Sequence, residues 1–238
     1  GRNLAELNAF TEIIPGLRYL DCVSGACVYD LKKKKTLYSQ ALDPRIVKKL
    51  MEFALEEEAM IHVLSERSIV QRDQQSHMAD FHMGIYQTMF DKITDKLENI
   101  YNSFCQEPFP VLKLNLYHKD EYSRARTVER IKAAGLETAL ALAESTSLEC
   151  SAKGIDKGVG LKKLCEHLGL PLEQTIAVGD ADNDTMALKT AGLSIAMGNA
   201  TEPIKALADV IVADCDHNGC AEAIDKYLLA ENRPQKPV

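Results

Sequence analysis

Residues 175–184 read TIAVGDADND and carry the strongest structural signal in the chain. The run Thr175–Val178 is short, apolar and followed by Gly179, which is typical of a buried strand. Three carboxylates and an amide come next: Asp180, Asp182, Asn183 and Asp184. Crowded carboxylates repel one another, and a divalent cation that prefers oxygen ligands relieves this repulsion. The stretch therefore predicts a metal site directly after a buried strand.

Two other interpretations compete with a metal site. Asp184 can simply cap the helix that follows it, as acidic residues do at helix starts. The spacing also matches the first positions of an EF-hand, but that motif requires Gly where Thr185 stands and Glu where Ala191 stands. The EF-hand therefore fails, and the metal site is favoured over a capping loop.

Strands and helices alternate on both sides of this loop. The apolar spacing and the Gly and Pro stops predict helices at 158–170, 184–191, 201–208 and 219–230, and strands at 175–178, 193–197 and 209–213. Such alternation indicates a parallel sheet with helices on its faces. Ligands of these sheets bind beyond the carboxyl ends of the strands, where the acidic loop lies.

The middle of the chain has a different pattern. It predicts helices at 44–58, 81–101 and 119–134, and strands at 60–64, 67–71, 111–117, 137–142 and 146–150. In the strand 111–117, leucines alternate with Lys113 and Asn115, which indicates one open face. This α+β order predicts a separate domain. The N-terminal part predicts a helix at 3–13, a strand at 18–23 and a hairpin at 26–40, whose Lys32–Lys35 turn is expected to be solvated.

Lys157 precedes the helix that starts at Gly158. A cation near a helix N-terminus opposes the helix dipole unless an anion also binds there. A solvent-facing lysine or a surface pair with Asp156 is the alternative. A lysine beside a carboxylate–Mg²⁺ site supplies the positive charge that a phosphoryl group needs.

Composition narrows the function classes. The chain has 238 residues, 46% of them hydrophobic, and a formal net charge of −7. This charge argues against a general nucleic-acid binder, and no apolar run is long enough to predict a transmembrane helix. The 7 cysteines include no CxxC pair, so we predict neither a zinc site nor a redox pair, and we expect small core residues in a cytoplasmic protein.

The chain resembles the haloacid dehalogenase superfamily, in particular its Cof-type subfamily IIB phosphatases. The resemblance rests on several motifs: Lys157-Gly158, Gly179-Asp180-x-x-Asn183-Asp184 with Ala187 in place of a Met, Ala196-Met197-Gly198-Asn199-Ala200, the closing segment Asp209–Ala221, Gly1-Arg2 as the end of a Ser/Thr-Gly-Arg motif, Ser24-Gly25-Ala26 in place of Asn-Gly-Ala, and Leu148-Glu149 at the end of the mobile cap.

This resemblance implies an α/β fold with a Rossmann-like parallel-sheet core and an inserted α+β cap of type C2. The core would comprise residues 1–41 and 152–238, and the cap residues 42–151. It also implies a Mg²⁺-dependent phosphatase of small phosphorylated metabolites, such as sugar phosphates, that forms an aspartyl-phosphate.

The resemblance also implies roles for individual residues. Asp180 would ligate Mg²⁺, and Asp184 would support the metal directly or through water. Lys157 would be catalytic, neutralising the phosphate and the nucleophile, and Asn183 would hydrogen-bond the phosphoryl group. Asp182 falls at a variable position of the motif and receives no role.

The sequence departs from the family at its start. The nucleophile motif, Asp-x-Asp, belongs to a first strand upstream of the Ser/Thr-Gly-Arg motif, and nothing precedes Gly1 here. We therefore expect the first core strand and the nucleophile to be missing from the sequence given. The chain as given is predicted to be inactive, and the complete protein to be active.

Two alternatives stay open at this point. The first is a non-catalytic relative that binds phosphometabolites and metal. The second is an ion-pump phosphorylation domain, which shares the acidic motif, but the missing membrane span and the α+β insert argue against it. Lys113, His118 and Glu149 are candidates to face a substrate, with His118 expected at the solvent; the sequence indicates neither the substrate nor an oligomeric state.

Overall fold

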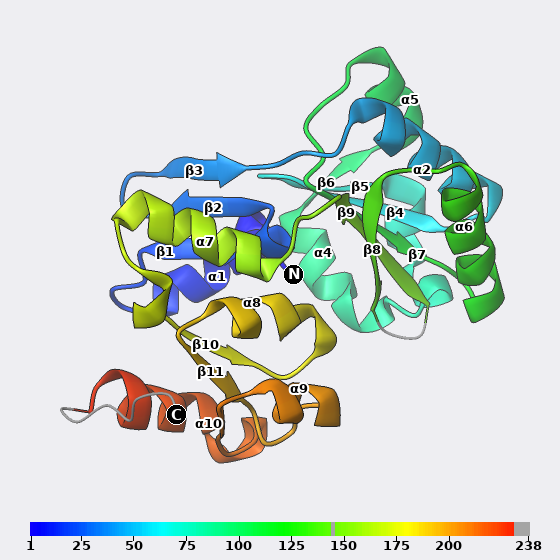
Figure 1. The fold of residues 1–238 in the computed structure, drawn as a ribbon. Coiled ribbons are helices and arrows are strands. Elements are labelled where there is room, and N and C mark those ends of the chain that lie inside the picture. The colour runs from blue at the N-terminus through cyan, green and yellow to red at the C-terminus, as the bar shows by residue number, and fades with distance from the viewer. Residues whose placement is uncertain (144–145, 231–238) are drawn as a thin grey trace. The chain divides into compact units, whose positions relative to one another are not determined.

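The computed structural model describes residues 1–143 and 146–230, which form two compact units, Gly1–Ile155 and Asp156–Val238. Each unit is described by itself (Figure 1). The assignment of residues 1–41 and 152–238 to one core concerns how the units combine and stays a prediction. Its last residues, 231–238, lie outside the described part of the chain.

The second unit is built on a parallel three-stranded sheet in the order β10-β11-β12. The strands are β10 (Ile176–Gly179), β11 (Leu193–Ala196) and β12 (Val210–Ile211). The helices are α7 (Lys157–Leu168), α8 (Thr185–Thr190), α9 (Glu202–Leu207) and α10 (Gly219–Ala223), which a π-helical turn continues over Ile224–Leu228. The predicted alternation and the parallel sheet are confirmed.

Alternate side chains of β11 pack on opposite faces of this sheet. Leu193 and Ile195 join a cluster that includes Ala223 of α10, while Ala196 joins Leu188 of α8 and Ile204 of α9. Apolar residues on both faces explain why this strand is mostly apolar, and the hydroxyl of its one polar residue, Ser194, donates to Asp209 Oδ2 at 2.8 Å.

The first unit begins with α1 (Leu4–Ile13) and an antiparallel sheet in the order β1-β2-β3. Its strands are β1 (Tyr19–Cys22), β2 (Cys27–Asp30) and β3 (Lys35–Ser39), with a 3₁₀ turn at Val23–Gly25. Asn3 caps α1 and exchanges hydrogen bonds with Glu6. All four lysines of the 32–35 turn are exposed, as expected for a solvated turn.

A six-stranded sheet completes the first unit, in the order β6-β5-β4-β7-β9-β8 (Figure 1). Its strands are β4 (Met60–Leu64), β5 (Ser68–Gln71), β6 (Thr94–Leu97), β7 (Lys113–Tyr117), β8 (Thr138–Ala143) and β9 (Ser147–Ala152). Helices α2 (Pro44–Glu56), α5 (Ile100–Gln106) and α6 (Glu121–Ala133) contribute Leu50, Phe104 and Ile131 to its largest apolar cluster. The predicted α+β order is confirmed for these helices and strands, except over residues 81–101.

The single helix predicted over 81–101 is wrong. The segment instead contains a 3₁₀ turn (Gly84–Tyr86), α4 (Gln87–Ile93), strand β6 and the start of α5; α3 (Arg72–Ser76) and another 3₁₀ turn (Met78–Phe81) precede it. Strand β6 pairs in parallel with β5, so the helices between them form a crossover. Sheet pairing over Thr94–Leu97 therefore overrides the local helical spacing.

The open face predicted for β7 is also wrong, because all five of its residues are buried. Leu114 and Leu116 face the helices of the largest cluster, whereas Tyr117 packs on the opposite face with Met60 and Val70. Both faces are covered, so the alternation of leucine with polar residues marks two different buried environments.

The cysteines separate into two groups. Cys22, Cys27, Cys150 and Cys165 are buried, as expected for small core residues, but Cys105, Cys215 and Cys220 are exposed, contrary to that expectation. Cys105 lies near the end of α5, Cys215 in the 3₁₀ turn Cys215–His217 and Cys220 in α10, where its Sγ lies 3.8 Å from Met197 Sδ. Over residues 1–143 and 146–230, no helix is both long and apolar enough to cross a membrane.

Candidate functional site

The predicted site residues lie at the carboxyl edge of the parallel sheet in the second unit. The loop after β10 carries residues 180–184, and the loop after β11 carries residues 197–201. Two backbone hydrogen bonds hold the second loop to the first strand end: Met197 N–H donates to the carbonyl of Gly179, the last residue of β10, at 3.0 Å, and Thr201 N–H donates to the Asp180 carbonyl at 3.1 Å. The acidic loop is thus fastened to the neighbouring strand end.

Asp184 is the structural centre of the acidic loop and is only 8% exposed. One carboxylate oxygen, Oδ2, accepts the N–H groups of Asp180 at 3.0 Å and Ala181 at 3.2 Å. The other, Oδ1, accepts a hydrogen bond from Lys157 Nζ at 2.5 Å. Burial raises the pKa of Asp184, but the Lys157 ammonium and the two amides outweigh it, so the pKa lies below its usual value.

Gly179 makes room for this carboxylate. A Cβ atom at position 179 would lie 2.5 Å from the Asp184 Cβ and 3.0 Å from its Oδ2. No side chain fits at that distance. Glycine at the end of β10 therefore lets the Asp184 side chain fold back against the strand and bind the loop amides.

Lys157 is brought to Asp184 by close packing of α7 on α8. Asp156 caps α7 by accepting the N–H groups of Gly158 and Val159 on Oδ1, and in the described part of the chain no ion pair joins it to Lys157. A Cβ at Gly158 would lie 2.5 Å from the Met186 carbonyl oxygen. The ion pair of Lys157 with Asp184 rules out both alternatives for this lysine. Its side chain neither points freely into solvent nor pairs with Asp156.

The Asp180 side chain is exposed and makes few hydrogen bonds with the rest of the protein. Its Oδ2 accepts one hydrogen bond, from Asn199 Nδ2 at 3.3 Å. Within the described ranges, no hydrogen bond to its Oδ1 is found, so this oxygen is not committed to a protein donor. Asp180 therefore has the free oxygen ligand that Asp184 lacks.

Asn183 lies in the 3₁₀ turn Asp182–Asp184, which follows Ala181 and leads into α8. Both Asn183 and Asp182 are exposed. The structure thus brings Lys157, Asp180 and Asp184 together through hydrogen bonds, whereas Asn183 shares only the loop.

Asn199 belongs to the site although the sequence assigned it no role. Its amide nitrogen bonds Asp180, and its Oδ1 accepts the Cys215 N–H at 2.9 Å. The motif Ala196–Ala200 was recognised as a whole, but nothing in one sequence distinguishes Asn199 from its neighbours there.

The donor set fits a Mg²⁺ ion that retains water. Among the residues the structure describes, no group of three or more His, Cys, Asp or Glu side chains could enclose a metal. Magnesium commonly uses one or two carboxylates, water and substrate phosphate oxygens instead of a full protein cage. Asp180 fits as a direct ligand, whereas both Asp184 oxygens are already occupied, which fits support through the loop or through water.

A second polar group lies in the first unit. Lys113 Nζ is 2.9 Å from Glu149 Oε2 and donates to Ser24 Oγ at 3.3 Å, and the Lys113 side chain is 1% exposed. The expectation that His118 lies at the solvent is wrong. Its ring hydrogen-bonds Thr127 Oγ1 at 2.9 Å under α6, and burial lowers its pKa.

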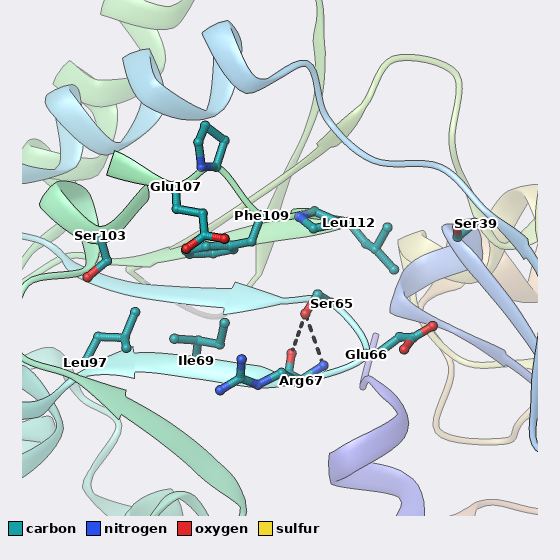
Figure 2. A pocket seen from close by; sticks show the side chains of 12 residues that line it. Ser39, Ser65, Glu66, Arg67, Ile69, Leu97, Ser103, Glu107, Phe109 and Leu112 are labelled. Carbon is teal, nitrogen blue, oxygen red and sulfur yellow. Dashed lines mark hydrogen bonds between the residues drawn. The ribbon is translucent and has the colours of Figure 1, made fainter. Parts of the chain in front are cut away.

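A pocket of about 680 Å³ also opens in the first unit, beside the turn between β4 and β5 (Figure 2). Its apolar walls come from Ile69, Leu97 and Phe109. Among the described residues that line it, the cation is Arg67, which already donates to Asp95 at 2.5 Å. None of the predicted site residues lines this pocket, so it does not carry the predicted chemistry.

Sequence comparison gives one family match and several partial relatives. Residues 1–224 match the family described as haloacid dehalogenase-like hydrolase. Phosphatase YwpJ of Bacillus subtilis is 45% identical over 83 residues, which are 35% of this chain and 29% of that protein. The phosphoglycolate phosphatase of Methanosarcina acetivorans is 33% identical over 142 residues, 57% of this chain and 62% of that protein. The chain therefore aligns with less than two thirds of either relative.

Solved structures resemble the chain over most of its length. A haloacid dehalogenase-like hydrolase from Bacteroides thetaiotaomicron superposes with a TM-score of 0.78 at 24% identity, covering 94% of this chain and 83% of that one. The subclass IIB sugar phosphatase BT4131 superposes with a TM-score of 0.71 at 20% identity, covering 93% and 78%. At these identities the likeness shows the fold, and it confirms the predicted α/β class.

Proposed function

The chain belongs to the haloacid dehalogenase-like hydrolase family, and from this premise we propose that the complete protein is a Mg²⁺-dependent phosphatase of small phosphorylated metabolites. The observation that carries the proposal is the arrangement of two carboxylates and one ammonium at a single strand end. Lys157 Nζ lies 2.5 Å from Asp184, and Asp180 in the same loop keeps an oxygen free. A phosphoryl group needs both a cation and a metal-binding carboxylate.

Lys157 is proposed to bind and orient the phosphoryl group. Its ammonium has three N–H donors and, among the residues described, one carboxylate partner, so it can donate to a phosphate oxygen while it keeps Asp184. Its side chain is 26% exposed, which leaves the ammonium within reach of a ligand. The exposed Asn183 amide is proposed to donate a second hydrogen bond to the same group.

Asp180 is proposed to hold the Mg²⁺ ion, with Asp184 in support. When bound, the metal polarises the phosphoryl oxygen and offsets charge that develops during transfer. Asp184 fixes the loop backbone at Asp180 and Ala181, so the position of the Asp180 side chain depends on it. We assign the ligand role to Asp180 because it has a carboxylate oxygen without a hydrogen bond, and the supporting role to Asp184 because both of its oxygens accept hydrogen bonds.

The proposed reaction has two steps, as the family resemblance implies. An aspartate of the complete protein attacks phosphorus and forms an aspartyl-phosphate, and the substrate alcohol leaves with a proton from a second aspartate. Water then hydrolyses the acyl phosphate, returning the aspartate and releasing inorganic phosphate. The residues assigned above bind and neutralise the transferred group in both steps.

A small phosphorylated metabolite is proposed as the substrate class because relatives with partial alignment bear such names. Besides phosphoglycolate phosphatase, the 5-amino-6-(5-phospho-D-ribitylamino)uracil phosphatase YcsE of Bacillus subtilis is 35% identical over 118 residues, 50% of this chain and 47% of that protein. The net charge of −7 gives no support to a nucleic-acid substrate.

The proposal is tested with the complete protein and p-nitrophenyl phosphate. We expect hydrolysis that a chelator stops and added Mg²⁺ restores, and that Asp180→Asn abolishes without changing the far-UV circular dichroism spectrum. If the protein does not hydrolyse the substrate under these conditions, the proposed phosphatase activity is wrong. If inorganic phosphate and Mg²⁺ still bind, the non-catalytic relative becomes the better account.

A further inference from the structure

Asn199 connects two loops at the carboxyl edge of the parallel sheet. Its Nδ2 donates to Asp180 Oδ2 at 3.3 Å, in the loop after β10. Its Oδ1 accepts the Cys215 N–H at 2.9 Å, in the 3₁₀ turn that follows β12. One carboxamide thus reaches from its own loop, after β11, to the loops on both sides.

Backbone hydrogen bonds of its neighbours fix the backbone around Asn199, without help from its side chain. Gly198 N–H donates to the Ala213 carbonyl at 3.1 Å, and Thr201 N–H donates to the Asp180 carbonyl at 3.1 Å. A Cβ at Gly198 would lie 2.8 Å from the Asp214 amide nitrogen. The carboxamide therefore starts from a fixed backbone, and the hydrogen bond that it gives Asp180 restricts the carboxylate rather than the loop.

The two bonds of Asn199 need a donor and an acceptor on one short side chain. Asn offers both, whereas Asp offers acceptors only and Ala offers neither. The donor binds Oδ2 of Asp180, and the other oxygen of that carboxylate has no hydrogen bond in the described part of the chain. The bond thus selects which oxygen stays available.

We infer that Asn199 is a positioning residue that orients Asp180 toward a divalent cation. This inference rests on the proposed metal site and names a residue that holds its ligand. Partners that hydrogen-bond a ligating carboxylate raise metal affinity by fixing its direction, and losing one typically costs about 10–100-fold in affinity. Asn199 itself touches neither metal nor substrate in this account.

Mn²⁺ titration without substrate tests the inference, with free Mn²⁺ measured by electron paramagnetic resonance. The complete protein is compared with Asp180→Asn, Asn199→Ala and the control Thr201→Ala. The Thr201 side chain makes no capping bond, and its backbone N–H is kept in the alanine variant. We expect Asp180→Asn to abolish the site, Asn199→Ala to weaken it about 10-fold or more, and Thr201→Ala to match the wild type.

The outcomes separate the inference from the proposed function. If the wild type has no Mn²⁺ site that depends on Asp180, the proposed metal site is wrong, and the inference falls with it. If that site exists and Asn199→Ala binds Mn²⁺ as tightly as the wild type, only the inference is wrong. An unchanged melting temperature of metal-free Asn199→Ala shows that the loss of affinity is not a general loss of structure.

A measurement on the wild type covers the case in which Asn199→Ala does not fold. In ¹H–¹⁵N spectra, Mg²⁺ should shift the Asn199 side-chain amide signals with the same concentration dependence as the Asp180 backbone amide. The Asn218 side chain, in the turn before α10, is the internal reference and should stay still. A shift at Asp180 without one at Asn199 would overturn the inference.

Discussion

Lys157 Nζ and Asp184 Oδ1 are 2.5 Å apart, and the second oxygen of the same carboxylate binds the amides of the loop that carries Asp180. One buried carboxylate therefore holds both the ammonium proposed to bind phosphate and the backbone of the proposed metal ligand. Because the two groups share this anchor, changes at Asp184 should affect stability and chemistry together.

Asp184→Asn should destabilise the protein. The substitution replaces one acceptor with an NH₂ group that faces the Lys157 ammonium, so a part-buried cation loses its partner. An unsatisfied group of this kind costs about 1–3 kcal/mol. Urea unfolding of wild type and variant measures the difference in the free energy of unfolding, and a difference within about 0.5 kcal/mol, the range of ordinary surface substitutions, contradicts the role of Asp184.

The contribution of Asp184 should depend on pH. Its pKa is depressed in the folded state, so the unfolded state binds the proton more readily at acidic pH. The stabilisation is then present above the unfolded pKa of about 3.9 and is lost as pH falls through the lower folded value. The gap in unfolding free energy between wild type and Asp184→Asn should stay constant from neutral pH to about pH 5 and shrink below about pH 4. A gap that widens with acid has the wrong sign for this account.

Gly158→Ala should weaken both stability and phosphatase activity. Alanine in a helix normally stabilises by about 1 kcal/mol relative to glycine, but here the new Cβ would lie 2.5 Å from the Met186 carbonyl oxygen and 2.7 Å from Thr190 Oγ1. Helix α7 must then move from α8 and carry Lys157 with it. Lys162→Ala, an exposed change on the same helix, is the control. A Gly158→Ala protein that melts higher and keeps its rate would show that the close packing is not needed.

The Lys113–Glu149 pair should behave as a coupled unit. Lys113→Met leaves Glu149 without its cation in a mostly buried position, and losing one partner of a buried pair costs about 3–5 kcal/mol when both are fully buried. Glu149 is 20% exposed, so a smaller loss is expected. Adding Glu149→Leu should restore part of that loss, since two apolar side chains leave no charge unpaired. Additive losses in this double-mutant cycle would show that the two residues are independent.

The acidic loop and its sheet were predictable because their signals are local. The apolar run at 175–178, the stop at Gly179 and the carboxylates that follow lie within ten residues of one another. The sequence predicts a cation at a helix start and carboxylates after a strand, and charge alone suggests that they meet. Their contact depends on how closely α7 packs on α8 at Gly158, which local sequence does not show.

The errors concern contacts between distant segments. Local spacing predicts a helix where β6 lies, because the pairing of β6 with β5 does not show in that spacing. The alternation of leucines predicts an open face for Lys113, because its partners, Ser24 and Glu149, come from segments far away in the sequence. Asn199 was missed for the same reason, since its two hydrogen bonds reach 19 and 16 residues along the chain.

The rate of Lys157→Ala in the complete protein tests the central claim most directly. The measurement is kcat/KM for p-nitrophenyl phosphate at saturating Mg²⁺, with wild type and Lys162→Ala beside it. The account predicts a loss on the order of 10²-fold or more for Lys157→Ala, because a preorganised charge at the phosphoryl group is removed, and a rate near that of the wild type for Lys162→Ala. A Lys157→Ala protein that hydrolyses the substrate as fast as the wild type would contradict the assignment of this strand end as the phosphoryl site.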